Sequence, residues 1–287
     1  MNKRKLVSIV IPMYYDKNIE NTVKNINSRY RIEIVIVLNG QNKEAKKIIN
    51  NLKRTSKFEI KVFNIKERNI GMAREVGCLK SSGEYLVMLD SDILLRKSAI
   101  DKLIKDLRRS DLSKGNLIYR YSNQFNKIVA ESRYIHSSGI KNAYTPLLAF
   151  RKEIAKKIGY YFNKKIPWTE DYEFDQRIKK MHLKLVGDAL AIGYHQPVSM
   201  SHDLHNSFNY GYGFSLALLN KLISGDSLYG KGNARLSIIK SDILRWINVF
   251  KNTMNYKNVN ISVKLYLIIW NVFFSLGKFY GCLMTQN

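Results

Sequence analysis

The chain has 287 residues, of which 45% are hydrophobic, so it is long and apolar enough for one large domain or for a domain with an appendage. Lysine and arginine together number 48 against 23 aspartate and glutamate residues, which gives a formal net charge of +25. These values exclude wholesale disorder and favour anionic partners: phosphate-bearing substrates, nucleic acid or an anionic membrane surface.

The first apolar run, LVSIVIP at 6–12, follows a basic start and so resembles a signal peptide. It is short and has no small-residue cleavage site, so a buried first strand explains it better. The two cysteines, Cys78 and Cys282, cannot form a disulfide framework or a four-cysteine zinc site. We therefore expect a protein of the reducing cytoplasm.

The first half of the chain alternates short apolar runs with amphipathic stretches. The apolar runs predict buried strands at 6–12, 32–40, 58–65 and 84–90. The amphipathic stretches predict helices at 18–26, 43–54, 72–82 and 98–107. This alternation is typical of an α/β fold with a mostly parallel sheet flanked by helices, in which ligands bind at the carboxyl ends of the strands.

The second half is less uniform. Residues 111–167 are irregular and rich in aromatic side chains, with a strand expected near 144–150 and a helix after it. A helix is predicted at 169–181 and a strand at 185–195. The last eighty residues are helical in pattern, with apolar segments near 236–250 and 261–277. The uncharged part of the second segment is too short for a standard bilayer span, so it either lies in a membrane interface or packs on the core.

Two aspartates close the strand predicted at 84–90. Asp90 and Asp92 are separated by Ser91, so both carboxylates can face one cleft. Mg²⁺ and Mn²⁺ prefer oxygen ligands, often take only one or two from the protein, and complete their shell with substrate phosphates. The Asp-Ser-Asp turn therefore indicates a metal–diphosphate site, although surface turns and helix caps show the same pattern.

A second acidic pair, Glu170 and Asp171, begins the helix predicted at 169–181. Acids in a first helical turn are stabilised by the helix dipole, which is the ordinary explanation. The functional explanation is that one of the two acids is a general base, because a carboxylate beside a second carboxylate has a raised proton affinity. His195, at the end of the strand at 185–195, is a candidate metal ligand or a structural histidine.

Four stretches in the same order resemble the family 2 glycosyltransferases, which have a GT-A fold. They are VSIVIPMYY, NIGMAREVGCLKSSGEYLVMLDSDI, TEDYEFDQRIKK, and YHQP with FNYGYG. The resemblance covers roughly residues 5–215. It implies a GT-A domain over residues 1–215, followed by a C-terminal helical region at 216–287 that is a candidate for membrane-interface contact.

The resemblance also implies roles for individual residues. Those it assigns to the nucleotide sugar are Pro12, Tyr14, Asn39, Asn69, Arg74, Asp90 and Ser91, with Pro12 and Tyr14 lining the base pocket. Asp92 would bind Mn²⁺ or Mg²⁺ directly, with Asp90 facing the ribose and metal-bound water. His195 would be a later metal or diphosphate contact. Asp171 would be the catalytic base, with Glu170 beside it.

The sequence departs from the family pattern at several points. Leu38 stands where the family usually has an aspartate, Tyr15 where asparagine is common, and Glu75 where the helix normally has asparagine. These changes leave the base of the nucleotide unassigned. The Gln-x-x-Arg-Trp motif of processive synthases is not matched, since DILRW has Asp242 in place of the glutamine.

The resemblance thus implies an inverting, metal-dependent, non-processive sugar transfer from a nucleotide-diphosphate sugar to an acceptor hydroxyl. The net charge suits a glycan or lipid-linked acceptor in cell-envelope polysaccharide or glycolipid synthesis, and a cytoplasmic enzyme with peripheral contact to the inner face of an anionic membrane.

Two other classes stay open. A sugar-phosphate nucleotidyltransferase also combines a nucleotide-binding α/β domain with metal-binding acids, but PMYYDKN lacks the expected glycine-rich loop. A non-enzymatic polyanion-binding protein would explain the charge but not the ordered acids. The basic residues are spread along the chain without a nucleic-acid motif, so nucleic acid is not expected as a partner.

Overall fold

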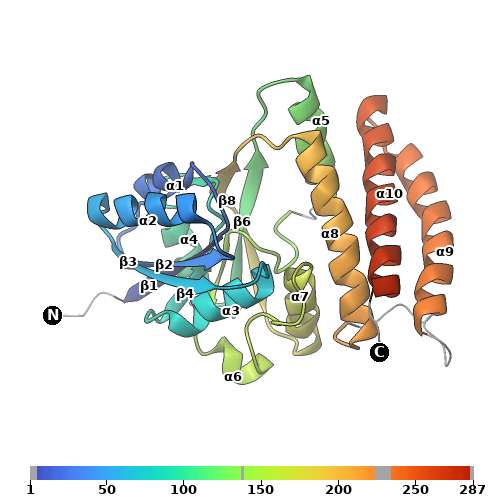
Figure 1. Cartoon of the computed structure of the whole chain (residues 1–287). Helices are drawn as coiled ribbons and strands as arrows, with labels where there is room; N and C mark the ends of the chain where they lie inside the picture. The colour runs from blue at the N-terminus through green and yellow to red at the C-terminus, as the bar shows by residue number, and fades with distance from the viewer. Residues whose placement is uncertain (1–4, 137–138, 224–233, 285–287) are drawn as a thin grey trace. The chain divides into compact units, whose positions relative to one another are not determined.

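Figure 1 shows the computed structural model, which describes residues 5–136, 139–223 and 234–284. The chain divides into two compact units. The first comprises Met1–Ile118 and Ser138–Gln196, and the second comprises Tyr119–Ser137 and Pro197–Asn287. Unit 1 contains the sheet with its flanking helices, and unit 2 is helical.

An eight-stranded sheet forms the centre of unit 1, in the order β3-β2-β1-β4-β7-β6-β8-β5. The strands are β1 (Leu6–Met13), β2 (Arg31–Asn39), β3 (Glu59–Ile65), β4 (Tyr85–Met88), β5 (Ile93–Leu95), β6 (Leu112–Tyr119), β7 (Leu148–Arg151) and β8 (Leu185–His195). β3, β2, β1 and β4 are parallel to one another, whereas β7 runs antiparallel to both β4 and β6. The expected parallel sheet is therefore present in the first half, and the whole sheet is mixed.

Both faces of the parallel half are apolar, because its strands lie between two layers of helices. On one face, alternate residues of β1 and β2 pack against α1 (Ile19–Asn25), α2 (Lys43–Thr55) and α4 (Ala99–Asp106). On the other face, Val10, Val35 and Val37 pack with α3 (Ile70–Lys80), α6 (Ile154–Ile158) and α7 (Glu170–Lys180). Figure 1 shows the two layers on opposite sides of the sheet. Burial on both faces is the reason for the continuous Ile and Val runs in these strands.

The segment at 111–167 is more ordered than its sequence suggests. It contains β6 and α5 (Gln124–His136) before the expected β7. β6 reads LSKGNLIY, in which a lysine and a glycine interrupt the apolar pattern of a strand. Lys114 is nevertheless buried in β6, because its Nζ donates a hydrogen bond to the Pro146 carbonyl at 2.6 Å.

Unit 2 contains α5 and three longer helices, α8 (Met200–Leu219), α9 (Ala234–Met254) and α10 (Ile261–Met284). α8 and α10 approach to backbone contact, since a side chain at Gly211 would meet the Phe274 carbonyl and one at Gly277 would meet the Phe208 carbonyl. Small residues spaced along two helices permit this close packing. Asp203 of α8 accepts hydrogen bonds from Arg133 of α5 at 2.6 Å and from Tyr266 of α10 at 2.7 Å.

α10 is longer than the sequence pattern predicts. Lys264 and Lys278 do not interrupt it, because Lys264 Nζ donates to the Met254 carbonyl at 2.9 Å and buried Lys278 pairs with Asp242 at 2.7 Å. Among the described helices, α10 alone is long and apolar enough to cross a membrane, by length and composition. The expectation of a short segment holds for the uncharged part between these two lysines but not for the whole helix.

Candidate active site

The proposed site residues come from the carboxyl ends of the strands and from two helix starts in unit 1. Tyr14 follows β1, Asn39 ends β2, and Asp90 follows β4. These strands are parallel neighbours, so their carboxyl ends share one edge of the sheet. Pro12 lies inside β1 opposite Val37 and is buried, whereas Tyr14 is 37% exposed. A contact between Pro12 and a nucleotide base stays a prediction.

Arg74 of α3 joins the two acidic pairs. Its Nη1 donates to Oε1 of Glu170, at the first residue of α7, and its Nη2 lies 3.1 Å from Oδ1 of Asp90. Arg74 and Glu170 are both buried. Burial alone would lower the pKa of Arg74, but the carboxylates of Glu170, Asp90 and Asp171 raise it above its ordinary value. This guanidinium is therefore a fixed positive charge between the two predicted acidic clusters.

Both carboxyls of the second pair have raised pKa values. Burial and the neighbouring Asp171 raise the pKa of Glu170 to about 7, against the opposing effect of Arg74. Burial and the charge of Asp90 raise the pKa of Asp171, against Arg74 and Lys114. Glu170 is committed to its ion pair with Arg74, whereas Asp171 is half-buried and meets only the Thr145 hydroxyl, at 3.4 Å, among the described side-chain hydrogen bonds. Asp171 is the better placed of the two to act as a base.

Lys114 is a charged neighbour of this site that the sequence analysis did not select. Its Nζ is held by the Pro146 carbonyl, next to Thr145, whose hydroxyl donates to Asp171. Burial lowers the pKa of Lys114 to about 8, while Asp171 and Asp90 oppose this effect. A lysine within the apolar pattern of β6 was the available signal, because a buried lysine needs a compensating partner.

The predicted metal-binding residues meet where the short strand β5 pairs with the end of β8. β5 runs antiparallel to β8 and places Ile93 opposite His195, so that His195 Nε2 lies 3.4 Å from Oδ2 of Asp92. His195 Nδ1 is 2.8 Å from the Gln196 carbonyl, which favours a proton on Nδ1 and turns Nε2 toward Asp92. Asp16 adds a further acid: its Oδ2 accepts a hydrogen bond from Ser91 at 2.8 Å.

This group of acids fits a hard divalent cation. Burial, Asp90 and Asp16 raise the pKa of Asp92 to about 6, with His195 opposing, so the negative charge of Asp92 is incompletely compensated. In the part of the chain that the structure describes, no three His, Cys, Asp or Glu side chains already form a metal-holding group. Mn²⁺ and Mg²⁺ need only one or two protein carboxylates when substrate phosphates supply the rest, so the donor set is compatible with them.

The predicted nucleotide contacts form a second group. The Asn69 backbone N–H donates to Asn39 Oδ1 at 2.7 Å, and Asn69 Oδ1 caps α3 by accepting from the Met72 backbone N–H at 2.8 Å. The Arg68 guanidinium stacks 3.7 Å from the centre of the Tyr14 ring. Arg68 is exposed and was not selected from the sequence, which offers no signal for this pairing.

The departure at Glu75 has a structural explanation. Glu75 is buried, and its Oε2 accepts hydrogen bonds from the backbone of Tyr161 and Phe162 at 3.0 and 2.9 Å. The Asn69 side chain donates to the Lys164 carbonyl at 2.7 Å. α3 thus fixes the segment at 161–166 that leads into α7. Leu38, the other departure in a strand, is a buried core residue of β2.

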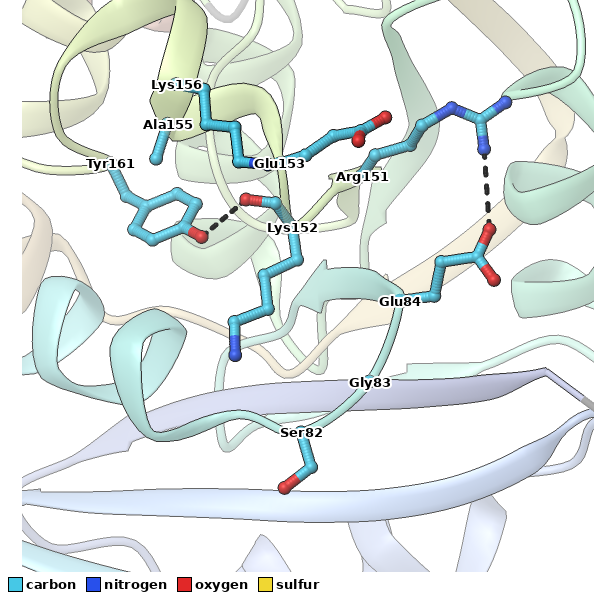
Figure 2. Close-up of a pocket in the computed structure, with 9 residues that line it drawn as sticks. All are labelled: Ser82, Gly83, Glu84, Arg151, Lys152, Glu153, Ala155, Lys156 and Tyr161. Atoms are coloured by element: carbon cyan, nitrogen blue, oxygen red, sulfur yellow. Dashed lines mark hydrogen bonds and ion pairs between the residues drawn. The ribbon is translucent and has the colours of Figure 1, made fainter.

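A separate hollow lies at the opposite end of β4. This cavity has a volume of about 700 Å³. Figure 2 shows the residues that line it, which are Ser82, Gly83, Glu84, Arg151, Lys152, Glu153, Ala155, Lys156 and Tyr161. Three of its charged side chains have partners: Arg151 lies 3.9 Å from Glu84, and Lys152 donates to the Ser81 carbonyl at 2.5 Å. Because Ser82–Glu84 precede β4 and Asp90 follows it, this cavity is not the predicted nucleotide-sugar site.

The family model for "Glycosyl transferase family 2" matches residues 8–163, which is more than half of the chain. The chain belongs to glycosyl transferase family 2. An uncharacterized glycosyltransferase of Rickettsia bellii is 26% identical over 136 residues, 46% of this chain and 18% of that protein. Glycosyltransferase GlyA of Streptococcus pneumoniae is 28% identical over 120 residues, 38% of this chain and 16% of that protein. This family 2 chain thus spans less than two thirds of the length of either relative.

Solved structures of glycosyltransferases share the fold of this family 2 chain. The mannosyltransferase PcManGT of Pyrobaculum calidifontis, in complex with GDP-Man and Mn²⁺, matches with a TM-score of 0.63 and 15% identity, covering 94% of this chain and 87% of that one. S. aureus TarS 1–349 in complex with UDP-GlcNAc matches with a TM-score of 0.54 and 15% identity, covering 88% and 76%. The predicted GT-A fold is confirmed.

Proposed function

We propose that this family 2 glycosyltransferase transfers a sugar, with inversion, from a nucleotide-diphosphate sugar to an acceptor hydroxyl. The observation that carries the proposal is the Arg74 bridge, which brings the aspartate turn after β4 and the acidic start of α7 to one guanidinium. A cation between a donor-binding cluster and a base of raised pKa suits displacement of a diphosphate.

In this mechanism Asp171 takes the proton from the acceptor hydroxyl. The acceptor oxygen forms a bond to the anomeric carbon of the sugar, and the bond from that carbon to the diphosphate oxygen breaks with its electron pair leaving on the nucleoside diphosphate. Arg74 holds Glu170 and Asp90 in place and supplies positive charge near the leaving group. Lys114, beside Asp171, helps to keep that carboxyl ionised.

The chain's own residues could also hold a divalent ion. Asp92, with Asp90 and His195, would bind Mn²⁺ or Mg²⁺, which supplies further positive charge to the diphosphate as it leaves. The Mn²⁺ and GDP-Man bound to PcManGT, and the UDP-GlcNAc bound to TarS, support a metal and a nucleotide sugar as ligands here. Tyr14, Asn39 and Asn69 would lie at the nucleotide, and the missing processive motif supports a single transfer.

The acceptor we propose is a cell-envelope glycan or a lipid-linked saccharide, reached from the cytoplasm with peripheral contact to the inner face of the membrane. The net charge of +25 supports an anionic surface as the place of work. The predicted division of the chain at residue 215, into a catalytic region and a C-terminal helical region, is part of this proposal.

The experiment that tests the proposed reaction is a panel of nucleotide sugars, each offered with Mn²⁺ or Mg²⁺ and scored for its released product. We expect free nucleoside diphosphate from at least one donor and none after chelation of the metal. Release of pyrophosphate would indicate a nucleotidyltransferase instead. Salt-sensitive binding to arbitrary nucleic acid, with no turnover of any donor, would indicate a polyanion-binding protein.

A further inference from the structure

Unit 2 exposes a row of apolar side chains along the whole length of α10, which we call the α10 stripe. Its members recur every three or four residues, so they lie on one side of the helix. They are Ile261 (58% exposed), Leu265 (53%), Ile269 (45%), Val272 (39%), Leu276 (51%), Phe279 (48%) and Leu283 (59%). At about 1.5 Å per residue the stripe is about 33 Å long, and such a continuous exposed row marks an interaction surface.

The opposite side of α10 is fixed within unit 2. It carries the close approach of Gly277 to α8, the Tyr266 hydroxyl bound to Asp203, and buried Lys278 paired with Asp242. Asn271, also buried there, accepts a hydrogen bond from Arg245 at 2.9 Å. The helix therefore has one packed, partly polar side and one apolar side open to solvent, and the stripe does not contribute to the core of unit 2.

This two-sided character favours a helix that lies along a bilayer surface over one that crosses it. If α10 crossed the bilayer, Lys278 and Asp242 would either enter the hydrocarbon together or separate and lose their ion pair, and both outcomes cost free energy. A helix lying in the interface plane buries only its apolar side, and it keeps the Lys278–Asp242 pair inside the protein.

The positive charge of this region favours a lipid surface, rather than a second copy of the chain, as the partner that covers the α10 stripe. Residues 234–287 contain one acidic residue, Asp242, against seven lysines and arginines. Two of these lysines are exposed: Lys251 in the last turn of α9, and Lys257 between α9 and α10. Two such strongly basic regions would repel each other in a dimer, whereas an anionic bilayer attracts both the lysines and the apolar stripe.

We propose that the α10 stripe is a docking surface for an anionic lipid bilayer, with α10 lying in the plane of the interface. The proposal deepens the membrane contact included in the proposed function and names its residues. The polar side of α10 stays packed on α8 and α9, while Ile269 and Leu276, near the middle of the stripe, enter the headgroup and acyl boundary.

The test is flotation of the purified full-length chain with vesicles of phosphatidylcholine, alone or mixed with phosphatidylglycerol. We expect co-flotation with the anionic vesicles, weakened by high salt, and little with the neutral ones. The double variant Ile269→Gln and Leu276→Gln should lower the bound fraction at least about tenfold, because each substitution removes an apolar side chain that would be buried in the bilayer. The matched control is Leu79→Gln and Leu190→Gln, two leucines of unit 1 that are 52% and 60% exposed, which should float like the wild type.

Three results would overturn the proposal: no flotation of the wild type, equal flotation of the stripe variant, or a wild-type dimer that the stripe substitutions dissociate without changing flotation. Protein recovered only as a detergent-requiring, bilayer-crossing species would also overturn the in-plane arrangement. Nucleoside diphosphate release is measured on the same samples. It tests the proposed reaction separately from membrane binding, because the stripe residues are not part of the candidate active site.

Discussion

At the scale of single residues, the site is a small set of charges that compensate one another incompletely. Arg74 balances Glu170 and Asp90, and Lys114 adds a second buried cation near Asp171. Asp92, by contrast, has no lysine or arginine among its described ion pairs, lies 3.4 Å from His195 Nε2, and has a raised pKa. Compensated charges are suited to holding geometry, and uncompensated ones to binding a ligand or moving a proton.

Replacement of the proposed base should separate activity from stability. Asp171→Asn keeps the size of the side chain and its place beside Thr145 but cannot take a proton, so we expect turnover to fall by about 10²–10⁴-fold. The free energy of unfolding should change by less than about 1 kcal/mol, because no ion pair is broken. Nucleoside diphosphate release and urea denaturation measure the two quantities.

The neighbouring acid provides the control for that variant. Glu170→Gln removes a charged partner of buried Arg74, so the free energy of unfolding should fall by about 2 kcal/mol. If Asp171→Asn turned over the donor at nearly the wild-type rate, the assignment of the base would be wrong.

Lys114 should set the pH range in which the proposed base works. A base must be ionised, so activity is lost as pH falls through the pKa of Asp171, which is already raised by burial. Lys114 opposes that rise. Lys114→Gln should therefore move the acid limb of the kcat profile to higher pH, while the amide still reaches toward the Pro146 carbonyl.

The matched control for this prediction is Lys179→Gln, which removes an exposed lysine of α7 that pairs with Asp175. It should leave the acid limb where the wild type has it. Equal profiles for wild type and Lys114→Gln would show that Lys114 is only a buried structural lysine.

At the scale of elements, the start of α3 needs a residue without a side chain. A Cβ at Gly71 would lie 2.6 Å from the carbonyl oxygens of Asn163 and Ile166, which are backbone atoms and cannot move independently. Gly71→Ala should displace the segment leading to Glu170 and Asp171, lowering the free energy of unfolding by about 2 kcal/mol and turnover with it. Gly159→Ala is the control: its site is open, so only its positive φ of 87° opposes the change, at about 1–3 kcal/mol, and turnover should stay at the wild-type level.

Denaturation and nucleoside diphosphate release of both glycine variants check this prediction. A Gly71→Ala protein with wild-type stability and activity would mean that the segment at 163–166 moves freely and does not position α7.

The elements that sequence predicts well are those whose pattern is set locally. β1 and β2 are nearly continuous apolar runs because both faces are buried, and Asp90 comes just after the end of another such run. β6 was missed because Lys114 and Gly115 break its pattern, and its lysine is acceptable only through a contact with Pro146, 32 residues away. The Arg74–Glu170 pair joins residues 96 positions apart, so only the sheet topology brings them together. The family resemblance selected Arg74, whereas Glu170 was already a candidate as one of two adjacent acids at a predicted helix start.

At the scale of the whole molecule, the charge distribution is uneven. The chain has 23 acidic residues in total, and Asp16, Asp90, Asp92, Glu170 and Asp171 all belong to the one site, within a chain of net charge +25. Under the proposed function, the positive charge would draw an anionic nucleotide sugar toward the protein, and a metal ion at the acidic turn would let that turn accept the diphosphate. The same excess charge favours the anionic bilayer proposed for α10.

Donor binding by isothermal titration calorimetry, with Mn²⁺ present or chelated, tests most directly whether the two acidic clusters serve one nucleotide sugar in different roles. We expect Asp92→Ala to lose metal-dependent binding, and Asp171→Asn to bind the donor within about twofold of the wild type while failing to turn it over. Metal-dependent binding by Asp92→Ala at wild-type affinity would contradict the account.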